Sequence, residues 1–173
     1  MKGIRKLCDE EGILMICDEV QCGMGRTGAM FAWQAYDIKP DIMSMAKAIG
    51  SGIPVGAFAM TEEVAKYSLE PGDHGTTYGG NPLACTAVSK TIEIFEKKHL
   101  VEHVQKVGAY LTKKLEELVE EYDTVKAVKG KGLMQGIQVT KPISEITGAA
   151  LKEGLLIIGA GSDVIRFVPP LII

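Results

Sequence analysis

Three short apolar runs separated by polar turns limit the folds that this chain can adopt. The first, "ILMIC" at residues 13–17, is continuous rather than alternating, which is typical of a parallel strand covered on both faces. Two further runs follow, "IMSMA" at 42–46 and "GAFAM" at 56–60. Together with the helical stretches around them, these runs predict an α/β fold, in which ligands bind at the carboxyl ends of the strands.

Helical patterns occupy much of the remaining sequence. The stretch "GIRKLCDEEG" at residues 3–12 has the composition of the last turns of a helix. Thr61 is expected to cap a short helix, and Asn81 followed by Pro82 is expected to start another that runs to Glu96 and is buried along its apolar first half. A further helix carries apolar residues at spacings of three and four, namely Leu100, Val104, Val107, Leu111, Leu115, Leu118 and Tyr122.

The last third of the sequence alternates short strands with turns. Strands are expected within residues 125–139, at "LLII" (155–158) and at "VIRFV" (164–168), with a helix over Glu145–Glu153 between them. This arrangement predicts a small α/β unit that is separate from the first three strands.

The patterns as a whole predict two domains, residues 1–95 and 96–173.

The formal net charge of −3 comes from 19 basic and 22 acidic residues and leaves no basic stripe, so nucleic acid is not an expected partner. No apolar run reaches the roughly 18 residues needed to cross a bilayer, so no membrane is expected either.

Cysteine and histidine spacing gives no sign of a disulfide scaffold or a metal site. The four cysteines show no C-x-x-C spacing, and Cys17 lies inside an apolar run, so we expect reduced thiols and a cytoplasmic location. His99 and His103 stand four apart on a predicted helix, as two metal ligands would. They lack the intervening acid and a nearby third ligand, so a solvated helix face is the expected reading.

A literal G-x-G-x-x-G pattern follows the first strand, at Gly23, Gly25 and Gly28. In a dinucleotide-binding fingerprint the first glycine comes almost directly after the strand and the third opens a helix. Here the residues from Asp18 to Gln21, and Cys22 after them, intervene, and the sequence after Gly28 is aromatic and irregular. A nicotinamide-binding function is therefore not expected.

Asp18 and Lys47 carry the strongest chemical signal. Asp18 ends the first apolar run, and Lys47 is the only charged residue between Asp41 and Glu62. A structural salt bridge for Asp18, or a lysine that extends along its own stem to solvent, would also account for each residue alone. As a pair they match what pyridoxal phosphate needs, a lysine for its aldehyde and a carboxylate for its pyridine nitrogen. A lysine removed from water would also be the better nucleophile.

Four motifs resemble the class III aminotransferases: "DEVQCGMGRTG", "PDIMSMAKAIGSGIPVGA", "GDHGTTYGGNPLAC" and "DVIRFVPPL". The resemblance runs from Ile4 to Ile173 and is nearest to the members that act on acetylornithine. It implies a fold-type I pyridoxal-phosphate transferase, with part of the large-domain sheet in residues 1–95 and an incomplete small C-terminal α/β domain in 96–173.

The resemblance also implies a role for particular residues. Asp18 matches the family's partner of the pyridine nitrogen, and Lys47 matches the lysine that forms the Schiff base with pyridoxal phosphate. Val20 and Gln21 match residues that line the ring, the first on its face and the second near its phenolic oxygen. Since side chains alternate along a strand, Asp18 and Val20 are expected to share one side.

Two threonines and an arginine complete the implied site. Thr77 matches the threonine that binds the cofactor phosphate of the neighbouring subunit, and Thr76 matches a residue near the substrate. Local turn chemistry would also explain both. Arg166 matches an arginine that meets a substrate carboxylate or a gating glutamate, although an arginine paired inside the second domain remains an alternative.

The implied activity is transfer of the terminal amino group of N2-acetyl-L-ornithine to 2-oxoglutarate, a step of arginine biosynthesis, by a cytoplasmic homodimer. There are two alternatives. The enzyme could use another ω-amine donor (ornithine, succinylornithine or 4-aminobutyrate), or the chain could be a truncated remnant without catalytic function. Family members carry a further N-terminal half, and this chain opens abruptly and finishes on an apolar run. We therefore expect a fragment that is inactive alone.

Overall fold

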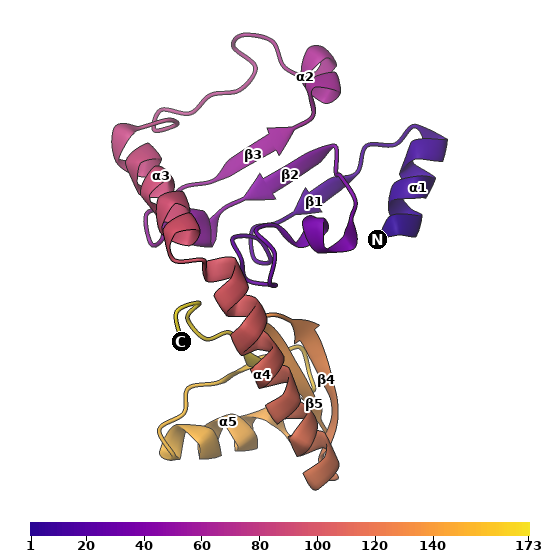
Figure 1. The fold of residues 1–173 in the computed structure, drawn as a ribbon, viewed down its shortest axis with the longest axis vertical. Helices are drawn as coiled ribbons and strands as arrows, with labels where there is room; N and C mark the ends of the chain where they lie inside the picture. Colours follow the sequence, from indigo (N-terminus) through magenta and orange to yellow (C-terminus); the bar gives the residue numbers. More distant parts are fainter. The chain divides into compact units, whose positions relative to one another are not determined.

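The computed structural model describes all 173 residues, which fold into two compact units. Unit 1 comprises Met1–Gly25 and Ala29–Leu100, and unit 2 comprises Arg26–Gly28 and Val101–Ile173. Each unit has its own sheet, of three strands in unit 1 and four in unit 2, and its own helices (Figure 1). No helix in the chain combines the length and apolar character that a membrane crossing requires.

The sheet of unit 1 contains the three expected strands. β1 (Ile16–Asp18) pairs in parallel with β2 (Ile42–Met45), and β2 pairs antiparallel with β3 (Ala57–Met60). In the parallel pair Asp18 lies opposite Ser44, so the carboxyl ends of β1 and β2 meet at one edge of the sheet. The predicted α/β class is confirmed at this level.

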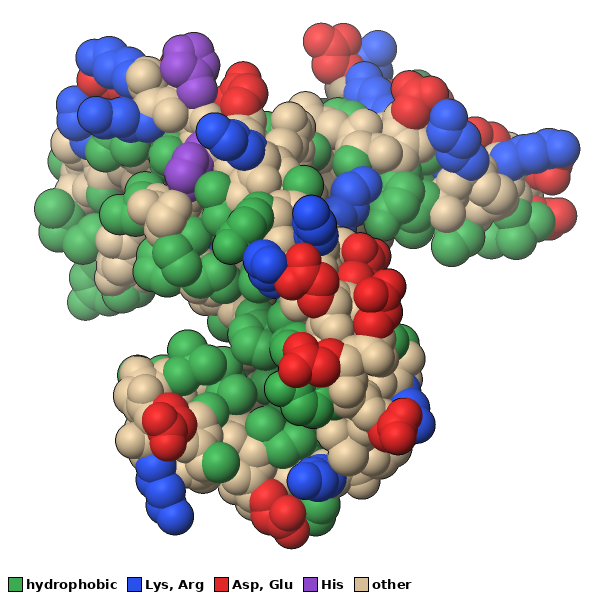
Figure 2. Space-filling view, turned by 60° about the horizontal axis from the view of Figure 1, so that its bottom comes forward, with side chains coloured by type: hydrophobic (Ala, Val, Ile, Leu, Met, Phe, Trp, Pro, Cys, Tyr) green, Lys and Arg blue, Asp and Glu red, His purple; other side chains and the backbone are tan.

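The expectation that the first strand is covered on both faces is wrong. β1 begins only at Ile16, and the side chains of Ile13, Leu14 and Ile16 are between 53% and 63% exposed. More than half of each of these side chains is exposed, so a run that is apolar enough for a core stays largely at the surface of unit 1. Hydrophobic side chains are visible among the charged ones in the space-filling view (Figure 2).

The helices of unit 1 begin and end at the expected signals. α1 (Lys2–Glu11) ends at Gly12, which has a φ of 64°. α2 (Glu62–Ser68) begins after Thr61, whose Oγ1 accepts a hydrogen bond from the amide of Val64 at 3.4 Å. The other helical elements of unit 1 are the 3-10 helices η1 (Ala32–Tyr36) and η2 (Lys47–Gly50) and the α-helix α3 (Pro82–Lys97).

Helix α3 has the predicted start but not the predicted burial. Asn81 accepts a hydrogen bond from the amide of Ala84 at 3.0 Å through its side chain, and Pro82 occupies the first turn. In the apolar first half Ala84 is buried, whereas Leu83 is 68% exposed. The face that carries Leu83 has no packing partner in unit 1, which is why apolar composition alone overestimated burial.

Unit 2 is an antiparallel sheet packed on one long helix. The strands lie in the order β4-β5-β7-β6, and α4 contributes its apolar stripe to a core around Leu115, Ile137, Val139 and Ile165. The elements are α4 (Leu100–Glu121), β4 (Val125–Lys131), β5 (Met134–Val139), α5 (Ile143–Lys152), β6 (Ile158–Ala160) and β7 (Val164–Phe167).

Two expectations about this unit's elements need correction. The run "LLII" is not a strand along its length, since β6 starts at Ile158, the first residue with a partner in β7. Leu156 before it is 84% exposed. His99 does not lie on a helix with His103, because α4 begins at Leu100 and His99 occupies the preceding turn with a φ of 49°. The ring of His103 instead lies 2.9 Å from the carbonyl oxygen of Ile173.

The glycine-rich segment after β1 is a series of turns that inserts Arg26–Gly28 into unit 2. Arg26 Nη1 donates to the carbonyl oxygens of Leu133 at 3.0 Å and Pro169 at 2.6 Å, and the Leu133 amide donates back to Arg26 O at 2.9 Å. Burial lowers the pKa of the Arg26 guanidinium, which has no carboxylate partner. Gly132 lets the segment approach, since a Cβ there would lie 2.6 Å from the carbonyl carbon of Thr27.

A matched pair of glycine substitutions tests this close approach. Gly132 and Gly161 both have positive φ, of 59° and 67°, but a Cβ at Gly161 would have nothing within 4 Å. Gly161→Ala is expected to cost about 1 kcal/mol from backbone strain alone. Gly132→Ala should cost at least about 2 kcal/mol, because the Arg26–Gly28 segment must also move. Urea unfolding followed by circular dichroism measures both, and equal losses would contradict the role given to Gly132.

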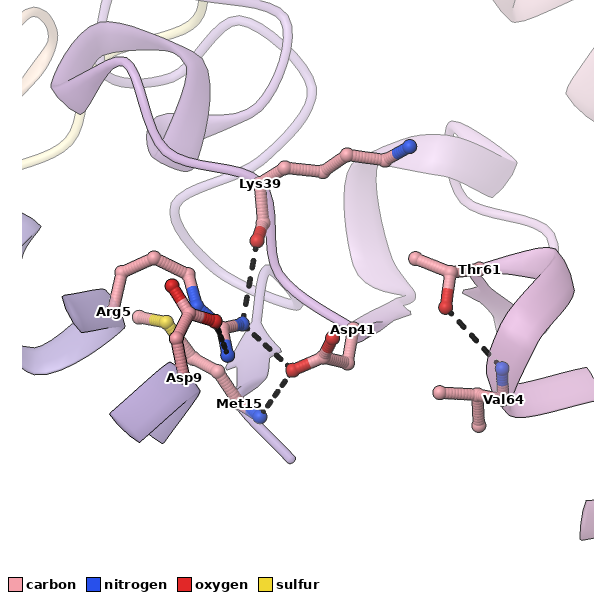
Figure 3. A network of polar contacts seen from close by, with 7 residues as sticks. All are labelled: Arg5, Asp9, Met15, Lys39, Asp41, Thr61 and Val64. Carbon is pink, nitrogen blue, oxygen red and sulfur yellow. Dashed lines mark hydrogen bonds and ion pairs between the residues drawn. The ribbon is translucent and has the colours of Figure 1, made fainter. Parts of the chain in front are cut away.

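A second polar cluster fixes α1 to the start of the unit 1 sheet (Figure 3). The guanidinium of Arg5 contacts Asp41 Oδ2 at 2.6 Å and Asp9 Oδ1 at 2.7 Å, and the Met15 amide donates to the same Asp41 oxygen at 2.6 Å. Burial alone would raise the pKa of the Asp41 carboxyl. The Met15 amide and the Arg5 guanidinium overcome this effect, and the pKa is lowered from its ordinary value.

This lowered pKa predicts an acid-dependent contribution to stability. Since the folded chain favours the carboxylate, the contribution is complete above about pH 4 and disappears as the pH falls through the lowered pKa. Asp41→Asn should therefore be less stable than the parent by about 1–3 kcal/mol at pH 7, and the difference should close in acid.

The only tryptophan, Trp33, belongs to unit 1, so its fluorescence during urea unfolding at several pH values reports on this cluster. Asp37→Asn is the control, because Asp37 and its partner Lys2 form an ion pair whose side chains are 92% and 68% exposed. A pH-independent gap between Asp41→Asn and the parent would contradict the prediction.

Candidate active site

Asp18 and Lys47 leave the unit 1 sheet at the same edge. Asp18 is the last residue of β1, and Lys47 follows β2 by two residues, as the first residue of η2. Because β1 and β2 are parallel and Asp18 lies opposite Ser44, both side chains come from the carboxyl ends of neighbouring strands. Ligands of open α/β sheets bind at this edge.

The Asp18 carboxylate is only partly used by the protein itself. Its Oδ1 accepts hydrogen bonds from the Val20 amide at 2.9 Å and from Ser44 Oγ at 3.3 Å. Its Oδ2 makes no hydrogen bond, and the residue is exposed. The hydrogen bonds to Oδ1 orient the carboxylate, and Oδ2 remains available to an N–H donor from outside the chain.

Lys47 combines a free amine with a strained backbone. It is exposed, makes no hydrogen bond or ion pair, and has a φ of 49°. A left-handed conformation is unfavourable for a residue with a Cβ, and such strain tends to concentrate at functional sites. The expected removal of this lysine from water is wrong in this structure, where Lys47 is exposed.

The residues after Asp18 form a turn rather than a continued strand. β1 ends at Asp18, so Val20 lies beyond the strand. The expectation that Asp18 and Val20 share one face of a strand is therefore wrong. Val20 is half-buried and Gln21 exposed, and the hydrogen bond from the Val20 amide to Asp18 sets the start of the turn. The alternation of side chains applies only within a strand, and β1 would have to continue for two more residues to include Val20.

Glu19 is a residue of this region that sequence reasoning missed. It is only 4% exposed, and its carboxylate accepts hydrogen bonds from the amides of Ala32 and Trp33, both at 2.9 Å, and from Cys22 Sγ at 3.2 Å. Burial raises the pKa of the Cys22 thiol to about 11, and the hydrogen bond to Glu19 adds to the shift. The sequence did contain one signal that could have drawn attention to Glu19, namely a second acidic residue directly after Asp18 in a mainly apolar stretch.

Thr76 and Thr77 lie in the exposed loop between α2 and α3. Thr76 lines a cavity of about 710 Å³ that runs along the start of β3 and the first turns of α3. Neither threonine's hydroxyl is hydrogen-bonded to Asp18 or Lys47, so the structure does not join them to that pair by direct contact.

Arg166 belongs to unit 2. It lies on β7, opposite Gly136 of β5 and Ile158 of β6. Its Nε is buried without a hydrogen-bond partner, and its guanidinium forms no ion pair. The alternative of an arginine paired inside the second unit is therefore not observed, and the cation keeps its hydrogen-bonding capacity.

The whole sequence matches one family. Residues 1–173 match the family described as Aminotransferase class-III. The chain belongs to the class III aminotransferases. The acetylornithine aminotransferase of Methanocaldococcus jannaschii is 47% identical over 173 residues, covering 100% of this chain and 43% of that relative. The predicted family is thus confirmed.

Solved aminotransferase structures have the same fold. The ornithine delta-aminotransferase of Plasmodium falciparum superimposes with a TM-score of 0.92 at 33% identity, covering 100% of this chain and 46% of that one. The acetylornithine aminotransferase of Elizabethkingia anophelis gives 0.92 at 32% identity, covering 99% and 44%. The chain therefore has the fold-type I transferase architecture expected from its sequence, and it spans less than half the length of these relatives.

In a class III aminotransferase the cofactor would be pyridoxal phosphate, and the residues at this edge suit it. The unused Oδ2 of Asp18 can accept a hydrogen bond from a protonated pyridine nitrogen, and the uncommitted amine of Lys47 can react with an aldehyde. The donor set is thus compatible with the two ends of the pyridoxal ring. No group of three or more His, Cys, Asp or Glu side chains is arranged to hold a metal ion.

The strain at Lys47 gives a measurable prediction. Lys47→Gly should be more stable than Lys47→Ala by about 1 kcal/mol, because only glycine adopts a positive φ without cost. Urea unfolding followed by Trp33 fluorescence measures the difference. At Lys39, which has no positive φ, the order should reverse and the alanine variant should be the more stable. The same order at both positions would refute the strain assigned to Lys47.

Proposed function

We propose that this chain carries the lysine and the ring-nitrogen partner of a pyridoxal-phosphate-dependent aminotransferase. The observation that supports this proposal best is the pair of uncommitted groups at one sheet edge, the Asp18 carboxylate oxygen and the Lys47 amine. Membership of the class III aminotransferases supports the same assignment.

Each residue has a definite task in the proposed site. Pyridoxal phosphate, when bound, supplies an aldehyde that takes up amino groups and a ring that accepts electrons from the substrate carbon that bears the transferred amino group. Asp18 holds a proton on the ring nitrogen, which requires its carboxylate form. Lys47 holds the aldehyde carbon and moves a proton to and from the substrate carbon. Val20 packs on the ring face, and Gln21 donates to the phenolic oxygen.

The remaining predicted residues have further roles in the proposed activity. Arg166 binds a substrate carboxylate, for which its unpaired guanidinium supplies a planar fork of donors. Thr76 lies near the substrate, and Thr77 binds the cofactor phosphate of a second subunit in a homodimer. In this proposal unit 1 is part of the large cofactor-binding domain and unit 2 is the small domain.

For the amino donor we propose N2-acetyl-L-ornithine, with 2-oxoglutarate as acceptor, in arginine biosynthesis in the cytoplasm. The name of the 47% identical relative supports this donor over ornithine. Because the relatives are more than twice as long, we also propose that turnover requires further polypeptide to complete the site. Parallel assays of the two donors by the completed enzyme distinguish them, and a preference for ornithine would overturn the choice.

Site-selective cofactor attachment tests the central assignment. After incubation with pyridoxal phosphate and reduction with borohydride, peptide mass spectrometry should find the cofactor on Lys47. Lys47→Ala should lose this label. Asp18→Asn should need about 10- to 100-fold more cofactor for half-labelling, the cost of losing a hydrogen bond to a charged group.

Lys39→Ala is the matched control. Lys39 is exposed like Lys47, but it follows the 3-10 helix η1 and does not lie after the carboxyl end of a strand. It should leave the label on Lys47 unchanged. Label spread evenly over the exposed lysines, with no preference for Lys47, would overturn the proposed function.

A further inference from the structure

The buried carboxylate of Glu19 lacks the compensation that such groups usually have. Carboxylates are rarely buried unless they are paired, yet Glu19 is 4% exposed and forms no ion pair. Its partners are two backbone amides, one for each oxygen, and one thiol. The Glu19 side chain is therefore held in place by hydrogen bonds alone.

The main chain of Glu19 is held as firmly as its side chain. Its amide donates to the Ser44 carbonyl oxygen at 3.0 Å, and its own carbonyl oxygen accepts from the Gly23 amide at 3.0 Å. Cys22 Sγ lies within hydrogen-bonding distance of both Asp18 O, at 3.3 Å, and the Glu19 carboxylate. The turn from Asp18 to Gly23 is therefore fixed at its start, its end and its centre.

The two oxygens of Glu19 connect this turn to the first residues of η1. Oε2 accepts from Ala32 and Oε1 from Trp33, while the Trp33 indole donates to Met43 Sδ of β2 at 3.4 Å. The segment that carries Asp18 is thus connected to β2, the strand that leads to Lys47, by a second route besides the β1–β2 ladder.

We propose that Glu19 is a positioning residue for the proposed cofactor site. It holds the Asp18–Gly23 turn so that the Asp18 carboxylate and the Val20 side chain face the cofactor ring. This role rests on the proposed function, but the turn itself can be measured without any cofactor. A carboxylate is required because both oxygens face N–H donors, and an amide would turn its own N–H₂ toward one of them.

Amide hydrogen exchange in the ligand-free 173-residue chain provides the first test. Glu19→Gln should speed exchange of the Val20 amide by about tenfold or more, because the hydrogen bond from Val20 to Asp18 depends on the fixed turn. Glu63→Gln is the matched control, since Glu63 is an exposed acid on α2. It should leave the Val20 exchange rate unchanged.

Ala32→Pro gives a second variant in case Glu19→Gln does not fold. It removes one of the two amide donors to Glu19 at the first position of η1, where proline is tolerated, and Phe31 already has the extended φ of −127° that a following proline favours. A folded Ala32→Pro chain, judged by Trp33 fluorescence and circular dichroism, should show faster Val20 exchange. Parent-like exchange in a folded variant of either kind overturns the proposal.

Nitrogen NMR of isotope-labelled pyridoxal phosphate, attached to Lys47 by borohydride, provides a readout that a merely structural role would not change. In Glu19→Gln the ring nitrogen should lose its proton at a pH about one unit lower than in the parent, since Asp18 holds that proton less well. An unchanged titration overturns the positioning role. Failure of the parent chain to label at Lys47 overturns the proposed function instead, and the exchange result still decides whether Glu19 fixes the turn.

Discussion

The parallel pairing of β1 with β2 is the constraint on which the candidate site depends. A parallel ladder places the carboxyl ends of both strands at one edge, so residues 29 positions apart in the sequence, Asp18 and Lys47, leave the sheet together. Neither residue is chemically informative without that pairing. An antiparallel arrangement, such as β2 has with β3, would send the two side chains to opposite edges.

The site is built with unused hydrogen-bonding capacity. In unit 1, Asp18 keeps one carboxylate oxygen free and Lys47 keeps its amine free, and both residues are exposed. Separately, in unit 2, the Nε of Arg166 is buried without a partner, and an unpaired buried donor normally costs stability.

The sequence predicted the elements well where a local signal exists. The caps at Thr61 and Asn81, the turn at Gly12 and the strands of unit 1 all follow from short-range chemistry. Burial was predicted poorly, as the exposed Ile16 and Leu83 show, because it depends on what packs across a face. A pairing of Asp18 with Lys47 could be proposed from residue type, whereas Glu19 was missed, because the amides that bind its carboxylate lie 13 and 14 residues away in the sequence.

The insertion of Arg26–Gly28 into unit 2 has a consequence for the order of folding. This short segment precedes most of unit 1 in the sequence, yet Arg26 bonds to carbonyl groups 107 and 143 residues further along. The chain crosses between the units after residues 25, 28 and 100. Unit 2 is therefore not one continuous segment of the chain. Its completion requires Arg26 to meet the carbonyl groups of Leu133 and Pro169, and contacts of such high sequence separation form slowly.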